Sequence, residues 1–157
     1  MSALDRTTAP DALSAHEQDM TGISWHREAE GVKIEWTDDL TVGNPLLDEQ
    51  HKTLIAMINT LGRASLSVEE LGEVIFGLLE YAAVHFRDEE AYFADVAPEI
   101  IPAHFESHTA FIAGAYRFVQ RFQRGEALAL RDTVYDFLCN WLIHHIRDED
   151  SQYYRQP

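Results

Sequence analysis

Residues 67–93, SVEELGEVIFGLLEYAAVHFRDEEAYF, decide the fold of this 157-residue chain. Ser67 followed three residues later by Glu70 is a capping box, which marks the start of a helix. Apolar residues then recur every three or four positions, and a histidine and a glutamate continue the same stripe: Leu71, Val74, Ile75, Leu78, Ala82, His85 and Glu89. This spacing predicts one long amphipathic helix that ends near residues 93–96, before Pro98.

Three other segments have the same period. Asn44-Pro45 is a helix-start signal and predicts a first helix over residues 46–63. A third helix is predicted over residues 102–125, since Gly125 is a suitable C-cap, and a fourth carries apolar residues from Val134 to Leu142. Because short connections join these segments, we predict an all-α fold, an antiparallel up-down four-helix bundle.

Residues 1–35 lack this period. They are polar, with scattered Gly and Pro, and predict a loosely structured N-terminal extension. Residues 36–157 would then form the bundle. A domain of this length buries roughly 68–70% of the surface that its unfolded chain exposes, which is enough for one real core.

The composition narrows the class of protein. Hydrophobic residues make up 46% of the chain against only 8 Gly and 5 Pro, which is typical of a globular protein. Twelve basic and 27 acidic residues give a net charge of -15, which would repel phosphate backbones and anionic lipids, so we expect neither nucleic acid nor a membrane as partner. Cys139 is the single cysteine, and no stretch approaches the ~20 apolar residues that span a bilayer, so we predict a cytoplasmic protein.

Each of the four apolar stripes contains a side chain that can bind a metal. In chain order these are His51, His85 and Glu89, His104 and His108, and His145. Either pair alone could be two surface residues four positions apart. Together they need another explanation, because buried unpaired imidazoles and carboxylates carry large desolvation costs that a shared metal centre would remove. Imidazole and carboxylate together suit iron.

Two choices arise in the fourth helix. At about 100° per residue, His145 falls on the apolar stripe and His144 does not, so His145 is the inward residue. The same periodicity favours Asp148 over Asp150 as the inward carboxylate. On an ideal helix Asp150 would point almost to the far side.

This set of residues resembles the signature of the hemerythrin family. The resemblance covers about residues 36–154 and includes Val42-Gly43, the run Asp48-Glu-Gln-His51-Lys, and Trp141-Leu142. It favours Asp150 over Asp148, since the family places its aspartate five residues after the last histidine, and the last turn must then distort. It implies two non-haem iron ions with a bridging oxo or hydroxo group. The implied ligands are His51 and His85 on one iron, His104, His108 and His145 on the other, and Glu89 and Asp150 as bridges.

Such a ligand set implies a function. It leaves one of about twelve octahedral positions open, on the iron with two histidines, where dioxygen could bind. Ile55, Trp141 and Leu142 are predicted near that position, and a dry apolar wall without an acid favours reversible binding over cleavage of the O–O bond. We therefore expect an oxygen-binding protein for storage, delivery or sensing.

Three alternatives stay open. The same centre could serve an enzyme, such as a peroxidase, an oxidase or a nitric-oxide-reducing protein. Residues 1–35 could report oxygenation to a protein partner, which the sequence does not identify. A zinc site is also conceivable, although a tetrahedral structural site rarely needs seven ligands.

Overall fold

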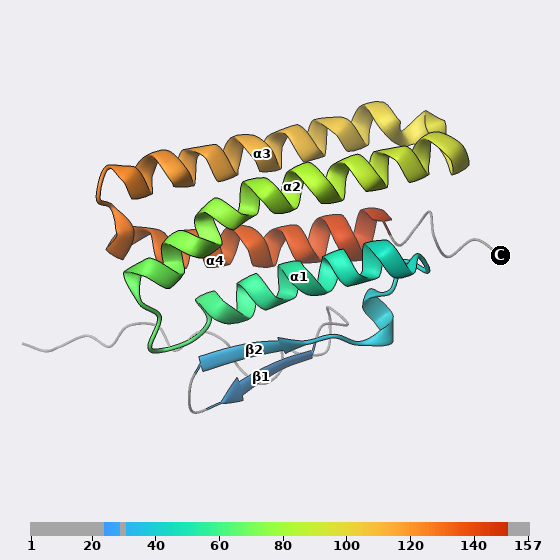
Figure 1. Cartoon of the computed structure of the whole chain (residues 1–157). Helices are drawn as coiled ribbons and strands as arrows, with labels where there is room; N and C mark the ends of the chain where they lie inside the picture. Colours follow the sequence, from blue (N-terminus) through green and yellow to red (C-terminus); the bar gives the residue numbers. More distant parts are fainter. Residues whose placement is uncertain (1–23, 29–30, 151–157) are drawn as a thin grey trace, which may run out of the picture.

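The four predicted helices form the body of the molecule. A computed structural model describes residues 24–28 and 31–150, and Figure 1 shows its helices as an antiparallel bundle. Their bounds are α1 (Pro45–Leu61), α2 (Val68–Val96), α3 (Ile101–Gln123) and α4 (Ala127–Trp141). Short turns of 3₁₀-helix, η2 (Asp38–Leu40) and η3 (Pro98–Ile100), precede α1 and α3. The predicted fold class is confirmed.

The helix ends follow the local sequence signals. The side chain of Asn44 accepts hydrogen bonds from the backbone N–H groups of Leu46 and Leu47, which have no partner inside the helix. Ser67 and Glu70 form both halves of the predicted capping box at the start of α2. Gly125 follows the C-cap of α3 with φ of +84°, a conformation that glycine adopts without a steric penalty.

The inner faces of the helices form one apolar core. Leu54, Ile58, Ile75, Leu78 and Phe111 are each completely buried there. None of the helices in the described ranges is both long and apolar enough to cross a membrane. The apolar core holds the four helices in the register on which the polar residues described below depend.

A β-hairpin covers the outer side of α1 (Figure 1). Strands β1 (Ser24–Glu28) and β2 (Gly31–Glu35) pair antiparallel, with Ser24 opposite Glu35. The side-chain amide of Asn59 on α1 accepts a hydrogen bond from the N–H of Ile34 at 2.7 Å and donates one to its carbonyl oxygen at 2.9 Å. The side chain of Ile34 is only 1% exposed. The hairpin is therefore attached to the bundle.

No pattern in the sequence predicted these strands. A two-stranded hairpin is at best marginally stable by itself. Its stability therefore depends on contact with α1, which the local sequence does not reveal. Residues 1–23 of the predicted extension lie outside the described residues, and the division of the chain at residue 36 stays a prediction.

Candidate metal centre

The seven residues predicted as metal ligands all lie inside the bundle. Among residues 33–150, whose burial the structure describes, they are also the complete set of buried histidines and carboxylates. Each is at most 5% exposed: His51, His85, Glu89, His104, His108, His145 and Asp150. Burial without partners would be costly for every one of these groups.

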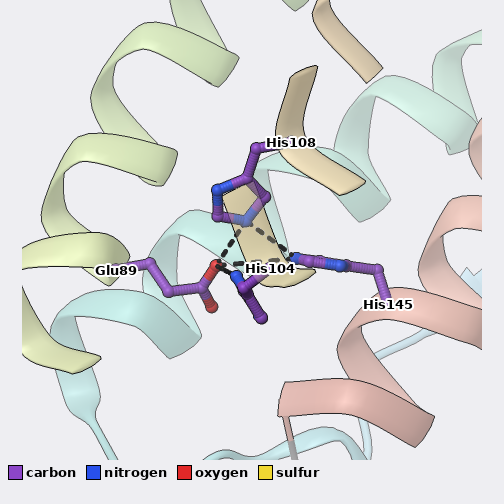
Figure 2. A group of neighbouring side chains, drawn as sticks. All are labelled: Glu89, His104, His108 and His145. Atoms are coloured by element: carbon purple, nitrogen blue, oxygen red, sulfur yellow. Dashed lines mark hydrogen bonds and ion pairs between the residues drawn. The ribbon is translucent and has the colours of Figure 1, made fainter. Parts of the chain in front are cut away.

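The inward nitrogens and oxygens gather into two groups that share Glu89. His51 and His85 form the two-histidine group, and His104, His108 and His145 form the three-histidine group; in each, ligand atoms of the histidines and of Glu89 lie within 4.8 Å of one another. Figure 2 shows the three-histidine group, with Glu89 reaching from α2 toward the imidazoles of α3 and of the segment after α4.

Glu89 lies between the two groups. Its Oε2 atom is 3.0 Å from Nε2 of His108 and 3.5 Å from Nε2 of His145. The same oxygen is 3.9 Å from Nε2 of His85, in the other group. One carboxylate thus faces both groups.

Asp150 takes a similar position because α4 changes its geometry. From Leu142 to Asp150 the chain forms a π-helix, η4, whose i→i+5 hydrogen bonding widens each turn. The residue five positions after His145 therefore returns to the inner face. Oδ1 of Asp150 lies 2.9 Å from Nε2 of His104, and Oδ2 lies 3.7 Å from Nε2 of His51.

Asp148 points elsewhere. Its side chain is 42% exposed and lies 3.7 Å from the exposed His144. The choice that ideal α-helical periodicity favoured is thus wrong for the inward carboxylate, and the distorted last turn implied by the family resemblance is present. The exposed His144 agrees with the prediction that His145 faces inward.

Three imidazoles are held from behind by hydrogen bonds. Nδ1–H of His85 donates to Oε1 of Gln50 at 2.8 Å, since the amide nitrogen of Gln50 itself donates to Asp88. Nδ1–H of His108 donates to Glu90 at 2.8 Å, and Nδ1–H of His145 donates to Glu149 at 2.9 Å. These bonds leave Nε2 of each ring directed at the centre, which is the nitrogen that would bind a metal ion after losing any proton it carries.

These three hydrogen-bond partners were not predicted from the sequence. A signal existed, because each directly adjoins a predicted ligand in the chain: Gln50 adjoins His51, Glu90 adjoins Glu89 and Glu149 adjoins Asp150. On a helix, the neighbour of an inward residue lies at the edge of the inner face, about 100° away. From there its side chain can reach Nδ1 of a histidine on an adjacent helix. In η4, Glu149 instead reaches Nδ1 of His145 within the same element.

Several inward atoms have no hydrogen-bond partner within the described residues. They are both ring nitrogens of His51, Nε2 of His85, Nδ1 of His104, Oε1 of Glu89 and Oδ2 of Asp150. Nε2 atoms of His108 and His145 lie 3.1 Å apart. Two ligands at right angles on one ion, with bonds of about 2.1 Å, have about that separation. Nitrogen and oxygen atoms that lack hydrogen-bond partners and face a common centre therefore fit as ligands of a pair of metal ions.

The buried environment keeps most of the imidazoles neutral, which is the form that binds metals. Burial, reinforced by the adjacent His85, lowers the pKa of His51 to about 3, and burial lowers the pKa of His85 to about 4. His104 behaves alike, with burial lowering its pKa to about 4. His145 differs: burial alone would lower its pKa, but Asp150, Glu149 and Glu89 outweigh that effect and raise it to about 10.

The two inward carboxylates differ from each other. Burial would raise the pKa of Glu89, but hydrogen bonds from His108 and His145 hold it well below the ordinary value. Burial and the charge of Glu89 raise the pKa of Asp150. With no metal ion between them, the two carboxyl groups therefore favour sharing one negative charge.

The three residues predicted to line an oxygen pocket do not all have the same neighbours. Ile55 and Leu142 belong to the apolar core. Trp141 stacks on His145, with ring centres 4.1 Å apart, and so lies against the three-histidine group. Its indole N–H is buried without a hydrogen-bond partner among the described residues.

A polar side chain that was not predicted also lies beside the two-histidine group. Tyr81, four residues before His85 on the same face of α2, stacks on that histidine with ring centres 5.1 Å apart. It is 6% exposed, and its hydroxyl has no hydrogen-bond partner in the described part of the chain. Burial, together with the charges of Glu89 and Asp150, raises the pKa of this hydroxyl, so it remains a donor. The i,i+4 spacing from His85 was the signal that could have found it.

Comparisons with known proteins agree with this geometry. Residues 42–156 match the family described as the hemerythrin HHE cation binding domain. The chain is 37% identical over 120 residues to a bacteriohemerythrin of Pseudomonas paraeruginosa, covering 75% of this chain and 77% of that protein. It is 34% identical over 121 residues to a hemerythrin-like protein of Naegleria gruberi, covering 75% of this chain and 88% of that protein.

A solved structure has the same arrangement of helices. The crystal structure of a wild-type hemerythrin superimposes with a TM-score of 0.66 at 29% identity, covering 76% of this chain and 93% of the other. The family match spans most of the chain and includes all seven buried histidines and carboxylates. The chain therefore belongs to the hemerythrin family.

Proposed function

We propose that this chain is a non-haem di-iron protein that binds dioxygen reversibly. The observation that carries the proposal is the shared position of two carboxylates. Glu89 belongs to both groups of ligand atoms, and the two oxygens of Asp150 face His104 of one group and His51 of the other. This supports two neighbouring ions rather than one, and membership of the hemerythrin family supports iron.

The proposal assigns a role to each inward side chain. One iron would be bound by His51 and His85, and the other by His104, His108 and His145. Glu89 and Asp150 would bridge them, together with an oxo or hydroxo group. When bound, the iron pair would supply two electrons and one open coordination position, on the ion with two histidines, for dioxygen.

The protein's own residues explain why binding would be reversible. Gln50, Glu90 and Glu149 hold three imidazoles in place, so ligand geometry needs little rearrangement. The complete burial of His51 and His85 keeps bulk water away from the two-histidine group. Exclusion of water suppresses proton delivery and loss of the bound oxygen as a reduced species.

An anaerobic metal count followed by oxygen titration tests the proposal. We expect about two irons per chain, as in di-iron carboxylate proteins generally, and an oxygenated spectrum that disappears when oxygen is removed. Zinc as the bound metal, or steady oxygen consumption without a reversible species, would refute it.

A second candidate function has one specific observation in its favour. The Tyr81 hydroxyl is a buried donor without a partner among the described residues, and a donor of this kind can assist turnover of peroxide or nitric oxide. A positioned proton donor contributes about 10²–10⁴-fold, so in an enzyme Tyr81→Phe would reduce turnover by that order. In a carrier, turnover would already be negligible in the unaltered chain.

Finer roles stay predictions. Storage, delivery and sensing all use the same centre, and a signalling role through residues 1–35 would need a protein partner. A cytoplasmic location also stays a prediction.

A further inference from the structure

A groove between α1 and α2 runs from the surface to His85 of the two-histidine group. Its volume is about 280 Å³. Its walls include Met57, Gly77, Tyr81, Val84 and His85. The side chain of His85 is nevertheless 0% exposed, so the inner end of the groove is closed to water in this structure.

A second, larger groove lies on the other side of α2. It has a volume of about 540 Å³, lies between α2 and α3, and is lined by Ala83, Phe86, Phe105 and His108 among others. Phe86 stacks flat against His108 with ring centres 3.8 Å apart, and Glu90 holds the ring from behind. This groove leads to the three-histidine group, which under the proposed function has no open position. Size alone therefore does not identify the route to the centre.

We propose that the groove between α1 and α2 is the route by which a small neutral molecule, a diatomic gas, reaches the two-histidine end of the centre. The inference rests on the proposed function, since it takes the open position to be beside His85. Three features of the groove support it: where it ends, what keeps it open, and its charge.

Tyr81 lies where the groove meets His85. This residue both lines the groove and stacks on His85, and its buried hydroxyl has no hydrogen-bond partner within the described residues. A diatomic molecule that passes the ring meets an available donor. Water would have to give up hydrogen bonds to pass the apolar surfaces of Met57, Val84 and the Tyr81 ring, so this part of the groove favours gases over water.

Gly77 lies at the end of the groove that is farther from His85, eight residues away along α2, and keeps that end open. A Cβ atom at this position would lie 3.3 Å from Cε of Met57 across the groove, which is already a tight contact. Any larger side chain would fill the space between the helices. An alanine needs the flexible end of Met57 to shift by a few tenths of an ångström, whereas a valine projects farther into the groove.

The charge at the groove discriminates against anions. Glu80 is exposed and lines the groove, and the whole chain carries a net charge of -15. Oxygen and nitric oxide are neutral and unaffected, whereas azide would be repelled. The route should thus be faster for neutral ligands than for anionic ones of similar size.

Paired variants test the route. We expect Gly77→Val to slow both association and release of oxygen by roughly tenfold or more, with little change in Kd, because filling a path raises the barrier in both directions. Met57→Ala should accelerate both. Ala83→Val places the same side chain on α2 in the other groove and is the control. Stopped-flow mixing and flash photolysis of the iron-loaded protein measure these rates.

The outcomes separate the route from the proposed function. Unchanged rates in Gly77→Val, or slowing in Ala83→Val instead, would overturn the route while leaving reversible binding intact. If Gly77→Val does not fold, the rates of Met57→Ala decide. Crystals pressurised with xenon give a readout independent of iron chemistry: density between α1 and α2 is expected in the unaltered chain, and its absence would count against the route. Glu80→Gln should accelerate azide binding but not oxygen binding; equal effects on both would remove the charge argument.

Discussion

At the scale of single residues, the groups behind the imidazoles differ between the two halves of the centre. His108 and His145 donate to carboxylates, whereas His85 donates to the neutral amide of Gln50. Nδ1 of His51 has no hydrogen-bond partner among the described residues. A carboxylate behind the ring raises the basicity of the histidine as a ligand. The three-histidine group should therefore hold its metal more tightly.

Replacement of Glu90 tests this difference. We expect Glu90→Leu to weaken binding of one iron by about 10–100-fold, the usual effect of removing such a partner. Glu90→Gln keeps an acceptor oxygen for Nδ1–H of His108 and is the matched control. Competition with a chelator measures the affinities; equal losses in the two variants would mean that the hydrogen bond is not the cause.

At the scale of elements, the π-helix η4 decides which aspartate faces inward. Asp150 is 0% exposed, whereas the side chain of Asp148 is 42% exposed. We expect Asp150→Ala to lose one or both irons and Asp148→Ala to keep them, because only Asp150 faces both histidine groups. Metal analysis after gel filtration measures the difference. Loss of iron in Asp148→Ala alone would contradict the geometry of η4.

The hairpin gives a second prediction at this scale. Asn59→Ala removes both hydrogen bonds to the backbone of Ile34, so we expect a loss of about 1–3 kcal/mol in the free energy of unfolding. Thr60→Ala is the control, since its hydroxyl only bonds to a carbonyl within α1. Denaturant unfolding measures both variants, and hydrogen exchange at Ile34 reports on the attachment of β2. A stable, fully protected hairpin in Asn59→Ala would show that apolar packing alone holds it.

At the scale of the whole molecule, the buried histidines make the metal-free chain sensitive to acid. The pKa values of His51, His85 and His104 are lowered to about 3, 4 and 4 in the folded chain, so the unfolded chain binds protons first as the pH falls below 6.5. Their contribution to stability is present above pH 6.5 and is lost toward pH 4. The pKa of His145 is raised to about 10, so its contribution to stability is lost as the pH rises above 6.5 and does not affect the acid range.

We therefore expect metal-free protein to lose stability steeply between pH 6.5 and 4.5. Each imidazole that responds fully contributes about 1.4 kcal/mol per pH unit. Urea unfolding at a series of pH values measures the slope, and His144→Ala, which alters an exposed histidine, should leave it unchanged. A slope near zero in this range would mean that the three imidazoles are not buried when metal is absent.

Several features of the molecule could be predicted from the sequence because they depend on near neighbours. The capping box Ser67–Glu70 and the cap at Asn44 involve residues two or three apart, and the helical stripes repeat every three or four residues. The types of residue on those stripes indicated a metal centre, and their order resembled one family. Helix hydrogen bonds reach only four positions along the chain, so the local sequence suffices for them.

Other features depend on residues far apart in the chain. Ile34 meets Asn59 across 25 positions, and His85 meets Gln50 across 35, so neither contact has a local signal. The π-helix was not accessible from periodicity either, since an ideal α-helix placed Asp148 on the inner face. By itself the sequence determined the four helices and the chemistry of their buried side chains. Only the packing of the helices decided that Asp150 faces both histidine groups, that Tyr81 lies against His85, and that a groove remains beside Gly77, because each depends on the distance between separate elements.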